Sequence, residues 1–210
     1  MTKKASTILR VLDELYPNAT VELTHNNTYE LLVAVILSAQ ATDVSVNKVT
    51  PELFKKYPDI HTLSLASEAD VMDIIKSIGL YKTKAKNIIL MANQVKERHN
   101  YMIPDNRKDL EALAGVGRKT ANVVLSNAFG VPLIAVDTHV HRVSIRLGIS
   151  KKTDNVHQTE LKLYKLFPKE RYTKLHHQLI FFGRYHCLAR RPKCMGCPLY
   201  NECVYENKTA

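Results

Sequence analysis

The stretch LAGVGRKTANVVLSNAFGVPLIAVDTHVHRVSIRL, residues 113–147, organises the rest of the chain. The glycines of Gly115-Val116-Gly117 provide two positions where a left-handed backbone costs little. The pattern from Arg118 onward has inward valines at helical spacing, so a helix is predicted to begin directly after the second glycine. Its first-turn N–H groups lack intrahelical partners. Together with the positive end of the helix dipole, they predict a place where a phosphate group binds.

A glycine-rich dinucleotide-binding loop is the first alternative for this turn. Such a loop follows a strand and has the spacing GxGxxG. Here the segment GVGRKTA lacks that spacing, and residues 109–113 favour a short helix. The order helix, tight turn, helix is therefore predicted. Taken alone, these residues also fit an ordinary helix hairpin whose glycines only form the turn.

Lys119 lies in the first turn of this helix, and Asp137 opens the next one. A free lysine amine has a pKa near 10.4, so only about 0.04% is neutral and nucleophilic at pH 7. A helix N-terminus and a desolvating cleft both favour the neutral amine. A carboxylate opposes this by stabilising the ammonium, but it can accept a proton and stabilise positive charge that develops during a reaction. Taken singly, Lys119 also fits a phosphate-binding surface lysine and Asp137 a helix N-cap. The pair in one motif favours catalysis.

All four cysteines lie in the last 24 residues, with the spacing C-x6-C-x2-C-x5-C: Cys187, Cys194, Cys197 and Cys203. Cysteines this close together in an unsecreted chain favour metal ligation over disulfides. Zinc and an iron–sulfur cluster both accept four thiolates, and the spacing alone leaves both open. The segment between the first two cysteines is basic, which suits contact with a nucleic-acid backbone.

The composition favours a polyanionic partner. The 210 residues contain 30 Lys and Arg against 20 Asp and Glu, a formal net charge of +10. Nucleic acid is favoured over a membrane, because the longest apolar run, residues 31–37, is too short to span a bilayer. The N-terminus has no apolar signal core. A soluble, cytoplasmic, nucleoid-associated monomer is therefore expected.

The rest of the chain has the pattern of helices. Lys82, Lys84 and Lys86 fit a solvated helix face. The one segment with a doubtful strand pattern is 133–136, so an all-α fold is predicted. Besides the helix that follows Gly117, helical segments are predicted at 6–16, 29–39, 43–57, 67–78, 83–98, 109–113, 137–147, 156–167 and 172–185.

Two segments resemble the endonuclease III family of DNA glycosylases. Residues 113–121, LAGVGRKTA, are similar to its helix-hairpin-helix, and residues 136–143, VDTHVHRV, to its catalytic aspartate segment. The resemblance extends over nearly the whole chain. Ala114 departs from the family, which usually has proline before the first glycine. This difference loosens the turn slightly and leaves the chemistry intact.

The resemblance implies two helical domains with the active site in the cleft between them. One is a six-helix bundle with the helix-hairpin-helix, residues 21–132. The other is an iron–sulfur cluster domain, residues 1–20 and 133–210, whose four cysteines bind a [4Fe–4S] cluster. On this division Lys119 and Asp137 come from opposite walls of the cleft.

The resemblance also implies the activity of a bifunctional DNA glycosylase and abasic-site lyase that removes oxidised pyrimidines in base excision repair. Lys119 attacks C1′, expels the base and forms a Schiff base, and β-elimination then cuts the strand. The partner is double-stranded DNA with a damaged pyrimidine or an abasic site. The target base is flipped out, Leu80 serves as an apolar wedge, and Gln40 hydrogen-bonds the orphaned base. The other expected DNA contacts are Gly115, Val116, Gly117 and His139.

Three competing functions are open. An adenine or mismatch glycosylase of the same superfamily usually carries a further C-terminal domain, whereas this sequence ends seven residues after Cys203. A non-catalytic DNA-binding protein with a redox-sensing cluster has no need of the pair Lys119 and Asp137. A zinc-ribbon interaction protein does not need the long helical segment before the cysteines. Local sequence also allows Gln40 as a polar helix terminus and Leu80 as a hydrophobic C-cap contact.

Overall fold

The computed structural model describes residues 2–208, and these residues contain helices and no strand. The prediction of an all-α fold is confirmed. Residues 133–136 are irregular, and the N–H of Ile134 donates to the Tyr164 hydroxyl at 3.1 Å. None of the described helices combines the length and apolarity that crossing a bilayer requires.

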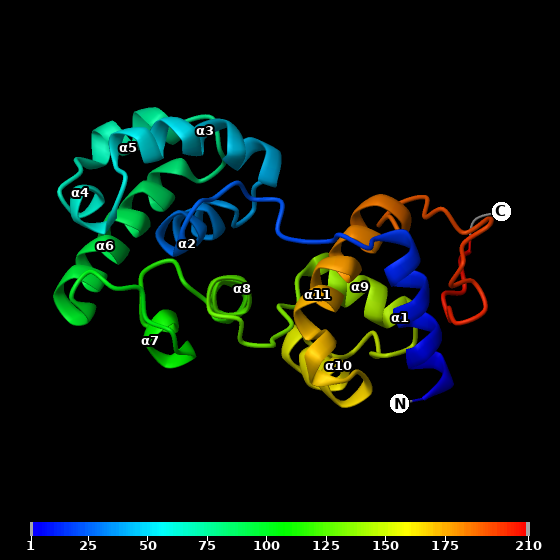
Figure 1. The fold of residues 1–210 in the computed structure, drawn as a ribbon. Helices are drawn as coiled ribbons and strands as arrows, with labels where there is room; N and C mark the ends of the chain where they lie inside the picture. Colours follow the sequence, from blue (N-terminus) through cyan, green and yellow to red (C-terminus); the bar gives the residue numbers. More distant parts are fainter. Residues whose placement is uncertain (1, 209–210) are drawn as a thin grey trace. The chain divides into compact units, whose positions relative to one another are not determined.

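The chain separates into two compact units. One comprises residues 21–130, and the other combines residues 1–20 with 131–210. In the first unit, α2 is the central helix, because every residue from Tyr29 to Leu37 is buried. It packs against α3, α6 and α8 (Figure 1). The helices of this unit are α2 (Thr28–Leu37), α3 (Asp43–Lys56), α4 (Ile60–Ser64), α5 (Glu68–Ile75), α6 (Tyr81–His99), α7 (Arg107–Glu111) and α8 (Arg118–Ala128).

Local caps explain where several of these helices begin. Asn27 accepts a hydrogen bond from the N–H of Glu30 at 2.9 Å and caps α2. Thr42 caps α3 and Ser67 caps α5 in the same way. The sequence analysis did not predict α4, a five-residue helix that Asp59 caps.

The second unit is built around a core shared by its first and last helices. Its members are α1 (Lys3–Leu15), α9 (Thr138–Arg146), α10 (Val156–Leu166), the 3₁₀ turn η1 (Lys169–Arg171), α11 (Tyr172–Phe181) and the π-helical turn η2 (Phe182–His186). Arg171 donates to both carboxylate oxygens of Asp13 at 2.7 Å, and Gln178 donates to the Leu12 carbonyl at 3.1 Å. These contacts hold the N-terminal helix against α11 although 158 residues separate Asp13 from Arg171.

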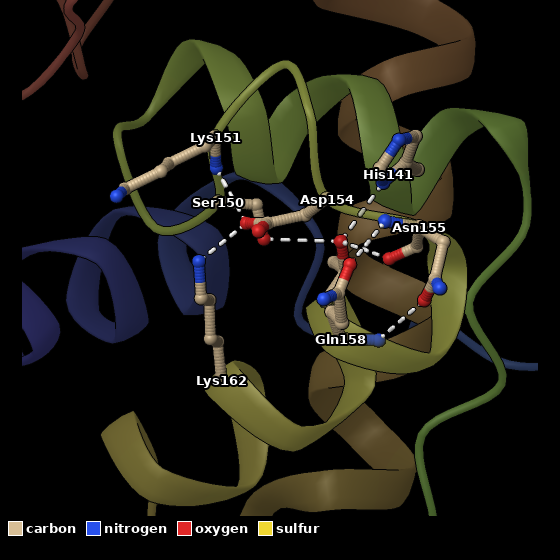
Figure 2. Close-up of polar contacts among 8 residues, drawn as sticks. His141, Ser150, Lys151, Asp154, Asn155, Gln158 and Lys162 are labelled. Atoms are coloured by element: carbon tan, nitrogen blue, oxygen red, sulfur yellow. Dashed lines mark hydrogen bonds and ion pairs between the residues drawn. The ribbon is translucent and has the colours of Figure 1, made fainter.

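A polar network joins α9 to α10 (Figure 2). The hydroxyl of the buried Thr159 lies 2.9 Å from His141 Nδ1 and 3.0 Å from the Ser150 hydroxyl. Asn155 and Gln158 form a reciprocal capping box at the start of α10, and Asp154 pairs with Lys162. The network therefore fixes the orientation of α9, the helix that Asp137 begins.

Candidate functional site

The hairpin turn lies between α7 and α8, as the sequence predicted. Of its two glycines only Gly115 uses the left-handed region, with φ of 76°, whereas Gly117 has φ of −101°. The expectation that both glycines serve a left-handed turn is thus wrong for Gly117. A Cβ on Gly115 would lie 3.0 Å from Ile36 Cγ2, whereas a Cβ on Gly117 would meet no atom within 4 Å. Gly117 leaves space open in front of α8.

The N-terminus of α8 has no side-chain cap. The first intrahelical bond runs from the N–H of Ala121 to the carbonyl of Gly117, at 2.9 Å. The N–H groups of the preceding turn therefore have no intrahelical partner, which is the arrangement that binds an anion. Lys119 lies in this turn and is exposed. The side chain of Val116 is buried, so only its backbone is available to a ligand.

Gln40 and Leu80 occupy neighbouring turns, and both have a left-handed backbone, with φ of 54° and 60°. The Gln40 carbonyl oxygen lies 3.9 Å from the position of a Cβ on Gly79, the residue before Leu80. Both side chains are exposed, Leu80 to 56%. Left-handed non-glycine residues cost about 1–3 kcal/mol each and cluster at functional sites. The structure brings this predicted pair together.

Asp137 and His139 lie at the start of α9. Asp137 Oδ1 accepts a hydrogen bond from the N–H of Val140 at 2.8 Å, so Asp137 is the N-cap of the helix. Arg142 donates to the Gly183 carbonyl at 2.7 Å and lies 3.2 Å from His139 Nδ1. Burial lowers the pKa of Arg142, Arg146 lowers it further, and Cys187 and Asp137 raise it. The Nε and Nη2 groups of Arg142 therefore bond within the protein.

The four cysteines carry free thiols and line one cavity in the second unit. Arg146 also lines it and donates to Cys187 Sγ at 3.2 Å and to the Leu188 carbonyl at 2.7 Å. Burial raises the pKa of the Cys197 thiol, and the three other sulfurs raise it further. Among the described residues, no three His, Cys, Asp or Glu side chains are arranged around a single metal ion. The cysteines surround a cavity, and a cation in it would offset their thiolate charge.

Sequence reasoning missed two residues of this region and misjudged a third. The sequence pattern did not indicate that Arg146 contacts a cysteine. It also did not indicate that Gln94 contacts the hairpin turn, where its Oε1 accepts a hydrogen bond from the N–H of Ala114 at 2.7 Å. The prediction that Lys84 belongs to a solvated helix face is wrong, because its side chain is only 4% exposed. Its Nζ has no hydrogen-bond partner among the described residues, and burial lowers its pKa.

The two residues of the proposed catalytic pair belong to different units: Lys119 to the unit of residues 21–130 and Asp137 to the other unit.

The hairpin, the capless helix and the start of α9 lie within a region that matches a known family. Residues 33–169 match the model of the HhH-GPD superfamily base excision DNA repair protein. The class is therefore that of the helix-hairpin-helix DNA repair proteins.

Relatives are similar over almost the whole chain. Endonuclease III of Escherichia coli (strain K12) is 50% identical over 204 residues, covering 96% of this chain and 95% of the relative. Endonuclease III of Bacillus subtilis (strain 168) is 49% identical over 201 residues, covering 96% and 92%. A solved structure of a trapped endonuclease III–DNA covalent intermediate superposes with a TM-score of 0.92 at 48% identity, covering 97% of each chain. This chain belongs to the endonuclease III family. It is a bifunctional DNA glycosylase and abasic-site lyase of base excision repair.

Proposed function

We propose that this enzyme excises oxidised pyrimidines from double-stranded DNA, with Lys119 as its nucleophile and Asp137 as the assisting carboxylate. The observation that carries the proposal is the position of Lys119, which is exposed in the first turn of a helix whose N-terminus has no side-chain cap. A sugar whose flanking phosphate binds that N-terminus is brought within reach of the amine.

The hairpin binds the DNA backbone through main-chain groups. The first-turn N–H groups of α8 contact a phosphate, and the missing side chain of Gly117 allows the phosphate to approach. Gly115 and Val116 contribute backbone only, because the side chain of Val116 is buried. His139, half-buried at the start of α9, binds a second phosphate. These contacts position the duplex without selecting a sequence.

Gln40 and Leu80 fill the gap that base flipping leaves. Unstacking a base costs a few kcal/mol, and an inserted apolar side chain offsets part of that cost. Leu80 is the wedge, and Gln40 hydrogen-bonds the base left without a partner. Their exposure supports this role, because both side chains are accessible to DNA while their main chains lie close together.

The reaction proceeds through a covalent intermediate. The Lys119 amine bonds to C1′ as the glycosidic bond breaks, and the base departs with the bonding electrons and takes up a proton. The sugar ring opens to a Schiff base between Lys119 and C1′. Loss of a proton from C2′ then breaks the bond between C3′ and its oxygen and cuts the strand. Asp137 accepts a proton from the nucleophile and stabilises positive charge on the sugar. Since Lys119 is exposed, its amine is accessible to C1′ of bound DNA.

The four cysteines hold a [4Fe–4S] cluster. Two observations support the cluster: all four thiols line one cavity, and their spacing C-x6-C-x2-C-x5-C is similar to that of the [4Fe–4S] cluster of the endonuclease III family. The cluster joins residues 187–203 into one element and takes no part in bond cleavage. The enzyme acts as a cytoplasmic, nucleoid-associated monomer, and its net charge of +10 supports attraction to DNA.

Borohydride trapping tests the proposal. The enzyme is incubated with a duplex carrying one thymine glycol, and the Schiff base is reduced to a stable adduct. We expect an adduct for the intact enzyme and for Lys82→Ala, which removes an exposed lysine from the first turn of α6. We expect no adduct for Lys119→Ala.

The possible results separate the candidate functions. Base release without an adduct would contradict the lyase mechanism and leave a hydrolytic glycosylase. An adduct that survives in Lys119→Ala would assign the nucleophile elsewhere. Tight binding without base release on any damaged duplex would favour a non-catalytic DNA-binding protein.

A further inference from the structure

Two side chains of α6 contact the hairpin turn. The N–H of Ala114 donates to Gln94 Oε1 at 2.7 Å, and a Cβ on Gly115 would lie 3.2 Å from Asn87 Cβ. Asn87 and Gln94 are seven positions apart, so they lie two turns apart on the same face of α6. One face of α6 therefore supports the turn that precedes α8.

The two contacts restrain the turn in opposite directions. At Gly115 a Cβ would already crowd Ile36 and Asn87, so the turn packs closely against both and this packing opposes movement further inward. The bond from Gln94 to Ala114 prevents it from moving outward. It joins residues 20 positions apart and is half-buried, so it is better shielded from water than a surface bond. The position of the α8 N-terminus depends on this bond, because only Val116 and Gly117 separate Gly115 from the helix.

We propose that Gln94 is a positioning residue that holds the hairpin turn ready for a DNA phosphate. This inference rests on the proposed function of the hairpin. Without the hydrogen bond, the Ala114 N–H has no partner and the turn samples other conformations. Binding must then order the turn, and that ordering lowers the affinity. The bond takes no part in chemistry, so the reaction of bound substrate is unaffected.

Gln94→Leu removes the acceptor and keeps a side chain of similar size. We expect the dissociation constant for a duplex with an uncleavable abasic analogue to rise about threefold to tenfold. The KM for base release should rise by the same factor, with kcat unchanged. Hydrogen exchange at the Ala114 amide should accelerate, while the amides in the middle of α8 keep their protection.

Asn93→Leu is the matched control. Asn93 is also a half-buried amide on α6, but its side chain bonds the Ile89 carbonyl of its own helix at 3.0 Å. We expect its affinity for DNA to match that of the unmodified enzyme. Ala114→Pro in the Gln94→Leu background is the rescue. Proline has no N–H to satisfy and holds φ near −65°, so the double variant should recover most of the lost affinity.

The outcomes distinguish this inference from the proposed function. Suppose that the unmodified enzyme forms the borohydride adduct and that Gln94→Leu binds the duplex as tightly as the unmodified enzyme. Gln94 then has no positioning role. Equal weakening in Asn93→Leu, or a folded double variant that regains no affinity, would also overturn the inference. Failure of the unmodified enzyme to form any adduct would contradict the proposed function and would leave the hydrogen-exchange result on Gln94 standing.

Discussion

The Asp137 carboxylate accepts a hydrogen bond of 2.8 Å from the N–H of Val140, so the proposed catalytic carboxylate is also the N-cap of α9. The bond uses Oδ1. Any loss of activity on replacing Asp137 therefore combines a chemical effect with a structural one. The two effects can be separated, because asparagine caps helices as well as aspartate does and alanine does not.

Asp137→Asn should fold as stably as the unmodified enzyme and lose at least about 100-fold in kcat, because the amide neither accepts a proton nor carries negative charge. Asp137→Ala should lose the same activity and also about 1 kcal/mol of stability. Urea unfolding and single-turnover base release measure the two quantities. If Asp137→Asn retained activity, the carboxylate would be a cap alone.

The two hairpin glycines should respond differently to alanine. Gly115→Ala should destabilise the protein by about 1–3 kcal/mol, because Gly115 has φ of 76° and its Cβ would crowd Ile36. Gly117→Ala should cost less than about 1 kcal/mol, since its φ is ordinary and its Cβ meets no atom. The methyl group would however occupy the phosphate-binding space. We expect Gly117→Ala to weaken binding to undamaged duplex about tenfold, measured by fluorescence anisotropy. Unchanged binding would mean that no phosphate approaches Gly117.

Leu80→Ala should impair base flipping while leaving the fold intact. Its side chain is 56% exposed, so its truncation should change stability by less than about 0.5 kcal/mol. We expect base release from a paired duplex to slow at least about tenfold, with a smaller loss on single-stranded substrate, where no stacked partner must be replaced. Leu65→Ala removes another exposed leucine, 66% exposed at the end of α4, and should have no effect on either substrate. Equal losses on paired and single-stranded DNA would exclude a wedge.

Lys84→Met should stabilise the protein, because Lys84 Nζ is buried and has no partner among the described residues. We expect a gain of about 1–3 kcal/mol at pH 7. Burial lowers the pKa of Lys84 from its ordinary 10.5, so the unfolded chain binds more protons between the two pKa values. In that interval, the Lys84 contribution makes stability rise with pH. The advantage of Lys84→Met should therefore shrink as the pH rises toward 10.5.

Urea unfolding at pH 7 and at pH 10.5 measures this effect. Lys82→Met is the control, since Lys82 is exposed and lies two positions before Lys84. Its replacement should change stability by less than about 0.5 kcal/mol at either pH. A destabilised Lys84→Met would mean that the ammonium makes a favourable interaction in solution.

Several features of the molecule could be predicted because their physical cause is local. Asn27, Thr42 and Asp137 each accept a hydrogen bond from an N–H group three positions further along the chain. Both partners of each helix cap are therefore close together in the sequence. The glycine turn before α8 and the cysteine spacing are equally local. By contrast, α4 was not predicted, although its Asp59 cap is equally local.

Other features depend on contacts between distant segments. Arg146 reaches Cys187 across 41 positions, and Gln94 reaches Ala114 across 20. Lys84 follows the same basic pattern as its neighbours but is buried on α6, which packs against α4 and α5. Nothing near these residues in the sequence specifies their partners. Folding brings the partners together, because burial of the apolar faces of the helices determines which polar side chains meet inside and which remain in water.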